Sequence, residues 1–315
     1  MRLKEFFCLK NMFGVLISLA LVVGCDNSNP VPTKSSPPSA LSSPARLSAA
    51  GNSAIIVSDY STGRVCFVDQ LSLEPTQCFS IAGQPTCVLS YSGKVFIGNR
   101  STRSVEVYNS SGSFLFYLED QTGIFSDVND LSIDKTSGTV YVLDAKALAI
   151  RAFNSVDGNE INTVVSANLA RPTALTVDQQ TGNLYVSDFG DPGGGILPRV
   201  RIFDSSGILI DEIVAVVSGG SLSSSQSFST PQGLCIGFNS SGNKFLFIAD
   251  AGASEIQVYD LLTKSSVKTI GVRGAADGEL FYPLDVYVEP VTRDVYVADN
   301  RNGRVVVYPG EGEVP

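Results

Sequence analysis

Residues 295–309 read VYVADNRNGRVVVYP, which is an alternating hydrophobic strand ending at Asp299, a short turn, and a second alternating strand. The same order of strand, Asp or Asn, turn and strand recurs at five earlier places. These segments are AIIVSDYSTGRVCFVD from Ala54, KVFIGNRSTRSVEVYN from Lys94, TVYVLDAKALAIRAFN from Thr139, LYVSDFG from Leu184 with RVRIFD from Arg199, and LFIADAGASEIQVYD from Leu246. Such repetition predicts a fold built from copies of one supersecondary unit.

The spacing of the repeats predicts the kind of unit. Consecutive acidic or amide residues at the strand ends are separated by 40, 45, 44, 62 and 49 residues. Each unit also contains an inner strand, often directly after a proline, and an outermost strand. A period in the forties with four strands per unit is typical of propeller blades. The sequence therefore predicts an all-β, six-bladed β-propeller with four-stranded antiparallel blades.

The last repeat carries a family resemblance. Residues 274–283, GAADGELFYP, followed by VYVADNRNGRV at 295–305, resemble the NHL repeat. The resemblance extends over residues 46–309, more loosely in the second and third repeats, and it implies six blades. The last repeat ends at its third strand, so its fourth strand has to come from elsewhere. The segment around or before Arg46 is the candidate, and the sequence leaves this closure open.

The N-terminus has the pattern of an export signal. A basic stretch is followed by an apolar run over residues 12–23, which is shorter than the roughly 20 residues of a membrane span. The run ends in LVVGC, which resembles the lipobox of bacterial lipoprotein signal peptides, with Cys25 as the lipidated residue. We therefore expect a signal peptide over 1–24, a lipid-anchored Cys25 with a Ser/Pro/Asn tether over 25–45, and the propeller over 46–315. The expected location is the bacterial cell envelope, on the inner or outer membrane.

Composition restricts the functions open to the chain. The net charge is −9, and it becomes −11 without the first ten residues, whose net charge is +2. An acidic surface repels phosphate backbones, so nucleic acid is not an expected partner. The sequence contains no histidine. This excludes Ser-His-Asp and Cys-His nucleophile systems and any imidazole metal ligand.

The residues at the strand ends have a structural interpretation. An Asp or Asn just after a strand can accept hydrogen bonds from the backbone of the following turn, and so fasten the blade. We expect this role for Asp59, Asn99, Asp144, Asp188, Asp250 and Asp299.

The cysteines suit an oxidising compartment. Cys66 and Cys78 fall on the third and fourth strands of the first repeat, where pairing around residue 72 places them opposite each other. This makes a Cys66–Cys78 disulfide a candidate. Cys87 and Cys235 fall on inner strands on different sides of the ring, so we expect two separate buried thiols.

Two long loops indicate where binding occurs. In a four-stranded blade, the turns between strands two and three share one face with the blade-to-blade connections. Both clear insertions, residues 189–198 and 218–230, belong to this face. Long loops on one face of a rigid scaffold are common binding sites. Residues next to the inner strands or the strand-end Asp residues are expected to surround the channel there, and the candidates are Arg100, Arg171, Phe189 and Tyr282.

These features favour a non-enzymatic binding or scaffold module for a protein, peptide or glycan. The alternative implied by resemblance to propeller enzymes is a lactonase-like hydrolase with a carboxylate-ligated, Ca-type metal; the related lyases depend on histidine, which the chain lacks. A third option is a structural spacer in an envelope assembly. No clear constellation of carboxylates stands on the inner strands, so the sequence predicts no metal site, no cofactor and no catalytic residue. The glycine run at 193–195 lacks the Gly-Lys-Ser/Thr ending of a phosphate loop.

Overall fold

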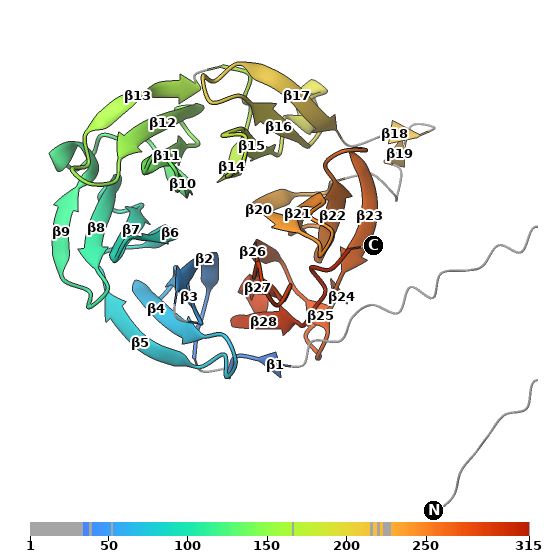
Figure 1. Ribbon diagram of the computed structural model, residues 1–315, viewed down its shortest axis with the longest axis horizontal. Helices are drawn as coiled ribbons and strands as arrows, with labels where there is room; N and C mark the ends of the chain where they lie inside the picture. The colour runs from blue at the N-terminus through green and yellow to red at the C-terminus, as the bar shows by residue number, and fades with distance from the viewer. Residues whose placement is uncertain are drawn as a thin grey trace, which may run out of the picture.

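The computed structural model describes residues 34–37, 40–51, 53–165, 167–214, 217–218, 221–222 and 228–314. The expected signal peptide and Cys25 lie outside these residues. Within the described part, the chain forms six four-stranded antiparallel sheets around a central channel, as Figure 1 shows. The predicted six-bladed propeller is confirmed. No helix in the described ranges is long and apolar enough to cross a membrane.

The first three blades each run from the channel outwards in chain order. Blade 1 contains β2 (Pro44–Gly51), β3 (Ala54–Asp59), β4 (Arg64–Asp69) and β5 (Pro75–Ser80); blade 2 contains β6 (Pro85–Tyr91), β7 (Lys94–Asn99), β8 (Ser104–Asn109) and β9 (Phe114–Tyr117); blade 3 contains β10 (Val128–Asp134), β11 (Thr139–Asp144), β12 (Ala149–Asn154) and β13 (Glu160–Val165).

Blades 4 and 5 have the same order, and blade 6 takes its outermost strand from the other end of the chain. Blade 4 contains β14 (Pro172–Val177), β15 (Leu184–Asp188), β16 (Arg199–Phe203) and β17 (Leu209–Val214); blade 5 contains β20 (Pro231–Phe238), β21 (Lys244–Asp250), β22 (Glu255–Asp260) and β23 (Ser265–Ile270); blade 6 contains β26 (Pro283–Val288), β27 (Val295–Asp299), β28 (Arg304–Tyr308) and β1 (Lys34–Ser35).

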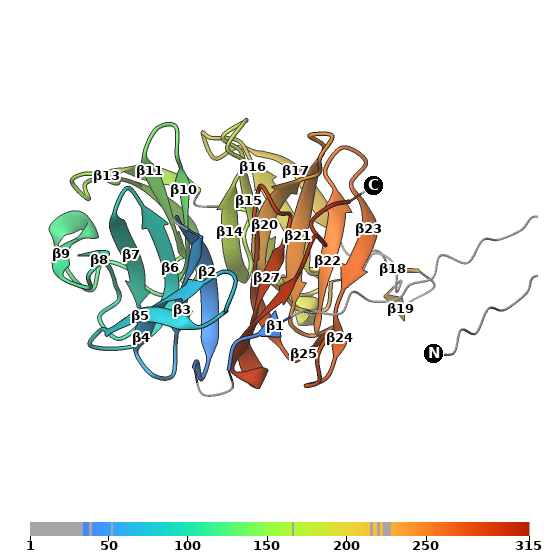
Figure 2. The ribbon, with the colours of Figure 1, turned by 60° about the horizontal axis from the view of Figure 1, so that its bottom comes forward.

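The ring closes through β1. Lys34 and Ser35 pair antiparallel with Val307 and Val306 of β28, and β1 lies beside the last blade in Figure 2. The next residue, Ser36, continues the pairing, because its amide donates to the Val305 carbonyl at 2.9 Å. The expected closure by a segment before Arg46 is confirmed.

This closure moves the start of the propeller away from the expected boundary. The Ser and Pro content of residues 34–45 predicts a tether. Instead, β1 covers the backbone groups of β28 that would otherwise form an open sheet edge, and Leu41 is buried between blades 6 and 1. The described propeller therefore begins at Lys34 rather than at residue 46.

Alternation in the strands explains the packing. Side chains on the two faces of each sheet point towards the two neighbouring blades, so both faces are apolar. The buried hydrophobic residues form six clusters in the described ranges, and each cluster combines side chains of two adjacent blades. The cluster between blades 6 and 1 is one of them, so the closing interface is packed like the other five.

Candidate functional site

The residues at the ends of the second strands do hold each blade together, and they also hold the chain that leads into it. Asp188, which is fully buried, accepts hydrogen bonds from the amides of Ala170 (3.1 Å) and Arg171 (2.8 Å), the two residues before β14. It also accepts from Gly190 in the following turn at 3.0 Å and pairs with Arg199. Each such carboxylate therefore fixes the backbone at the mouth of the channel. Equivalent bonds to the residues before the inner strand are made by Asp59, Asp144, Asp250 and Asp299.

Blade 2 carries an amide in place of the carboxylate. The Asn99 Nδ2 donates to the carbonyl of Ala82 at 3.2 Å and to Glu106 Oε1 at 2.8 Å, while its Oδ1 accepts from the Ser101 amide at 3.0 Å. The donor suits a neighbour that is itself a buried carboxylate, because a second buried negative charge there would be repelled.

Arg171 is fixed at both ends. Its amide is held by Asp188, and its guanidinium lies over the Phe189 ring, 4.2 Å from the centroid. The Nε also donates to the Gly190 carbonyl at 2.6 Å. A guanidinium over an aromatic face is a favourable cation–π arrangement. Arg171 and Phe189 thus form one ordered surface at the channel mouth.

Tyr282 has an unusual backbone. Its φ is 60°, in the left-handed region, and it directly precedes Pro283. A bulky residue in this region costs about 1–2 kcal/mol. The neighbouring Phe281 amide is held by Asp299 at 2.7 Å, and the guanidinium of Arg301 lies 4.6 Å from the Tyr282 ring centroid. Such a strained conformation persists where the surroundings impose it, which is common at functional sites.

These side chains meet at one cavity of about 790 Å³. We call it the loop-face cavity, because it opens on the face that carries the turns between second and third strands. Arg171, Phe189 and Tyr282 all line it, from blades 4 and 6. Sequence reasoning missed further polar side chains of the lining, which stand within two residues of an inner-strand start or of a strand-end Asp in blades 3 and 5. They are Asp127, Asn129, Lys146 and Gln232.

Arg100, the fourth predicted residue, does not line this cavity. It is more than half exposed, and its Nε lies 4.0 Å from Asp127, which does line the cavity. Its Nη1 also approaches the Tyr60 hydroxyl at 3.5 Å. The structure therefore brings three of the four candidates together. Arg100 lies outside the cavity, next to the lining residue Asp127.

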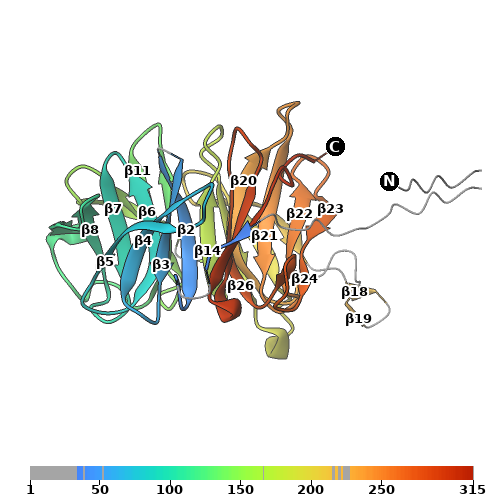
Figure 3. The same ribbon diagram turned by 90° about the horizontal axis from the view of Figure 1, so that it is seen from below.

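The two predicted loops have different positions. Residues 189–198 form a compact turn with η2 (Pro192–Gly194) and a bridge between Asp191 and Ile196, and Phe189 at its start lines the cavity. Much of residues 218–230 lies outside the described residues. Within them, β18 (Val217–Ser218) and β19 (Ser221–Leu222) lie outside the ring and away from the channel in Figures 1 and 3. The last residue of this insertion, Thr230, lines the loop-face cavity, whereas β18 and β19 do not.

The cysteines of blade 1 are joined. A disulfide links Cys66 on β4 to Cys78 on β5, which are directly opposed in the strand register. Cys87 and Cys235 are free thiols on the inner strands of blades 2 and 5. Burial raises the pKa of each thiol to about 12, so neither is a reactive thiolate near neutral pH.

A buried arginine closes the channel behind the loop-face cavity. Arg46, on β2, is 6% exposed. Its Nη2 donates to the Thr173 carbonyl in blade 4 at 2.8 Å, and its Nη1 donates to the Leu284 carbonyl in blade 6 at 2.7 Å. Its Nε lies 3.4 Å from Asp130 Oδ1 in blade 3. One side chain therefore connects four of the six inner strands.

Arg46 occupies a position that repeats around the ring. Each inner strand has an irregular register near its start. The third residue of each of these strands holds the equivalent position in the ring of blades. Sequence reasoning missed the role of this ring because its members share no chemical type. They are Arg46, Cys87, Asp130, Ala174, Gly233 and Asp285.

The ring contains two carboxyl groups for one guanidinium. Burial raises the pKa of Asp285 to about 7, and the charge of Asp130 adds to this effect while Arg46 opposes it. Burial likewise raises the pKa of Asp130. No group of three or more His, Cys, Asp or Glu in the described ranges is arranged to hold a metal ion.

Comparison with known proteins shows the fold. No protein-family model matches the chain, and no curated protein matches it. Among solved structures, a Bacteroides thetaiotaomicron protein of unknown function has a TM-score of 0.66 at 16% identity, over 85% of this chain and 70% of the other. Kuenenia stuttgartiensis hydrazine synthase gives 0.64 at 14%, over 85% and 96%. An auxiliary nutrient binding protein from Bacteroides ovatus gives 0.67 at 12%, over 86% and 70%. At these identities the likeness is one of fold, so the chain is a six-bladed β-propeller with solved structural neighbours.

Proposed function

We propose that this chain is a lipid-anchored envelope protein with an NHL-like propeller that binds a protein, peptide or glycan in its loop-face cavity, without catalysing a reaction. The observation that carries the proposal is the convergence of Arg171, Phe189 and Tyr282 on one cavity of about 790 Å³. This volume is within the range of roughly 300–1,000 Å³ that small-molecule sites have.

The chemistry of the cavity supports recognition of a polar chain molecule. Phe189 and Tyr282 offer ring faces, and Asn129 and Gln232 offer amide groups that both donate and accept hydrogen bonds. The carboxylate of Asp127 and the ammonium group of Lys146 add one charge of each sign. Aromatic faces with a few oriented polar groups are typical of binding sites. The sequence contains no histidine, and no group of three or more Cys, Asp or Glu in the described ranges is arranged to hold a metal ion.

The order of the site also supports binding. The backbone of Arg171 and the Phe281–Tyr282 segment are both held by buried carboxylates, and the Arg171 guanidinium already lies on Phe189. A site that is ordered before its ligand arrives loses less conformational entropy on binding. The nutrient-binding neighbour from Bacteroides ovatus has the same fold and is consistent with this use.

The test compares the lipidated full chain with two variants. The double variant Arg171→Ala/Phe189→Ala removes the ordered surface, and Arg100→Ala is the matched control from the same face. Each is used for affinity purification from membranes and for binding to arrays of peptides and of glycans. We expect one ligand class to bind the unchanged chain and Arg100→Ala, and to bind the double variant at least about tenfold more weakly. Equal binding by all three proteins would refute the proposed cavity.

Lipidation is tested separately. Labelled palmitate should enter the full chain in a bacterial host and be absent from Cys25→Ser. Label that persists in the serine variant would contradict anchoring at Cys25.

A further inference from the structure

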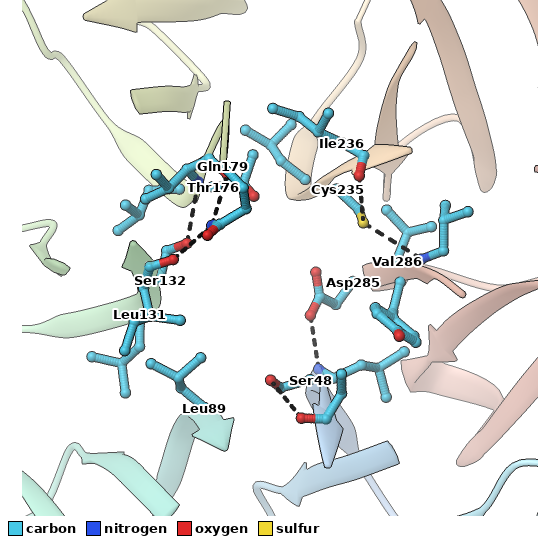
Figure 4. A pocket seen from close by; sticks show the side chains of 18 of the residues that line it. Ser48, Leu89, Leu131, Ser132, Thr176, Gln179, Cys235, Ile236, Asp285 and Val286 are labelled. Atoms are coloured by element: carbon cyan, nitrogen blue, oxygen red, sulfur yellow. Dashed lines mark hydrogen bonds between the residues drawn. The ribbon is translucent and has the colours of Figure 1, made fainter. Parts of the chain in front are cut away.

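A second cavity, of about 290 Å³, lies at the other end of the channel. It is enclosed by the inner strands and by the turns between first and second strands, and it shares no lining residue with the loop-face cavity. Its walls are mostly aliphatic, with Leu89, Leu131 and Ile236 among them, and the hydroxyls of Ser132 and Thr176 lie between these. Figure 4 shows this arrangement. The cavity is thus an apolar pocket of small-molecule size.

The floor of this pocket is the carboxyl group of Asp285. Its Oδ2 accepts a hydrogen bond from the Leu47 amide at 2.8 Å, and the adjacent Val286 amide also favours the ionised carboxyl. No side chain of the described residues donates a hydrogen bond to Oδ1, and Figure 4 shows the carboxyl projecting into the middle of the pocket. A Cβ atom at Gly233 would overlap Oδ1, so the glycine provides the space that this oxygen occupies. Asp285 is only 6% exposed and lines the pocket, so its carboxyl is a buried acceptor at the pocket floor.

The nearby cation, Arg46, makes its hydrogen bonds to other groups, although its charge acts on the Asp285 carboxyl. Arg46 uses its two terminal nitrogens on the carbonyls of Leu284 and Thr173, and its Nε faces Asp130. The Asp130 carboxyl in turn accepts from two backbone amides, each at 2.9 Å. The ionised floor would therefore hold two negative charges against one positive charge. Buried charge without a matching partner is unfavourable, and a bound cation would supply that partner.

We propose that this second pocket binds a small amphipathic organic amine, whose protonated nitrogen donates to Asp285 Oδ1 and whose hydrocarbon part packs against the aliphatic walls. The site is separate from the loop-face cavity and goes beyond the function proposed there. The groups that interact electrostatically with Asp285 are Arg46, Asp130 and the Cys235 thiol. The Cys87 thiol lies near Arg46 and Asp130, and Lys135 is exposed at the rim.

The pocket makes amine binding depend on pH. Because burial raises the pKa of Asp285 to about 7, the carboxyl is ionised at pH 8 and protonated at pH 5.5. An alkylamine stays protonated at both values. Binding should therefore be stronger at pH 8 by about tenfold or more, and a neutral alcohol of the same length should show no such change.

The experiment is calorimetric titration of the purified full chain with hexylamine and with 1-hexanol. We expect hexylamine to bind at pH 8 at least about tenfold more tightly than hexanol. Asp285→Asn keeps an oxygen to accept from the Leu47 amide, so the fold is retained while the charge is removed. It should abolish the preference for the amine. Asp277→Asn, an exposed carboxylate in the loop before β25 (Glu279–Leu280), is the control and should change nothing.

A second variant tests the location independently of charge. Ile236→Trp fills the pocket from its wall and should abolish binding of both probes, whereas Arg171→Ala/Phe189→Ala at the loop-face cavity should leave both unchanged. Equal affinity for amine and alcohol, undiminished amine binding in Asp285→Asn, unchanged binding in Ile236→Trp, or no binding of either probe would each overturn the proposal. None of these results would bear on the loop-face cavity.

Discussion

Arg46 reaches across the channel, and its Nη2 donates a 2.8 Å hydrogen bond to the carbonyl of Thr173 on the opposite blade. A propeller is otherwise held by contacts between adjacent blades, so this bond ties two inner strands that do not adjoin in the ring. The bond to Leu284 joins blade 1 to blade 6, which adjoin in the ring but come from opposite ends of the chain. The same side chain separates the loop-face cavity from the second pocket, because Thr173 lines the first and Asp130 lines the second.

Replacement of Arg46 should destabilise the protein strongly. Arg46→Met leaves Asp130 and Asp285 buried without a cation, and breaking a buried ion pair in this way costs about 3–5 kcal/mol. Urea denaturation at pH 8 should show this loss, and a smaller one at pH 5, where protonation of the carboxyl groups removes the unpaired charge. Arg100→Ala, which removes a largely exposed cation with a 4.0 Å ion pair, should cost less than about 1 kcal/mol. Equal losses for the two variants would contradict the role of Arg46.

Asp285 should make stability fall as pH rises. Its pKa in the folded protein is about 7, above the ordinary value of 3.8, so folding takes up a proton between these values. Stability from this group is therefore complete below about pH 4 and is lost progressively up to about pH 7, on the order of 4 kcal/mol in total. The free energies of unfolding of Asp285→Asn and of the unchanged chain are measured from pH 4 to pH 8. The value for Asp285→Asn minus that for the unchanged chain should increase over this window. A constant difference would show that the pKa is not raised.

Asp188 should tolerate no amide in its place. Asn has one acceptor oxygen, so in Asp188→Asn the amides of Ala170 and Arg171 cannot both be satisfied and Arg199 loses its ionic partner. We expect a loss of roughly 2–4 kcal/mol by chemical denaturation. Asp277→Asn, which removes a surface carboxylate, is the control for loss of charge alone. A variant as stable as this control would refute the fastening role.

The Cys66–Cys78 disulfide should contribute to stability through the unfolded chain. It closes a loop of 12 residues, for which the chain-entropy relation gives about 3 kcal/mol. Cys66→Ala/Cys78→Ala should melt at a lower temperature, and dithiothreitol should lower the melting temperature of the unchanged chain but not of the double variant. Insensitivity of both proteins to the reductant would mean that the bond forms no part of the native state in solution.

The repeated strand–Asp–turn–strand pattern was sufficient to predict the blades, because each copy contains its own alternation and turn. The closing strand was harder to locate. Lys34 and Ser35 have no hydrophobic alternation, and they form a strand only because β28 presents an unpaired edge to them. The local sequence of neither β1 nor β28 indicates that the two strands pair.

The candidate site divides in a similar way. Arg171, Phe189 and Tyr282 could be named because their positions beside an inner strand or a strand-end Asp place them at the channel mouth. The strain at Tyr282 and the role of Arg46 could not be foreseen. Arg46 stands two residues after a proline at the start of an inner strand, as Asp285 does in blade 6. Its function depends on carbonyl groups more than a hundred residues away.

The use of β1 to complete blade 6 would also limit how far a protein anchored at Cys25 could extend from its membrane. If the lipid is carried by Cys25, only eight residues lie between the anchor and Lys34, and an extended chain from one to the other spans roughly 30 Å. A free tether ending at residue 45 would span more than twice that distance, roughly 70 Å. The propeller would then lie close to the bilayer, attached at the outer strand of its last blade. Partners would have to be small enough, or near enough to the lipid surface, to reach it there.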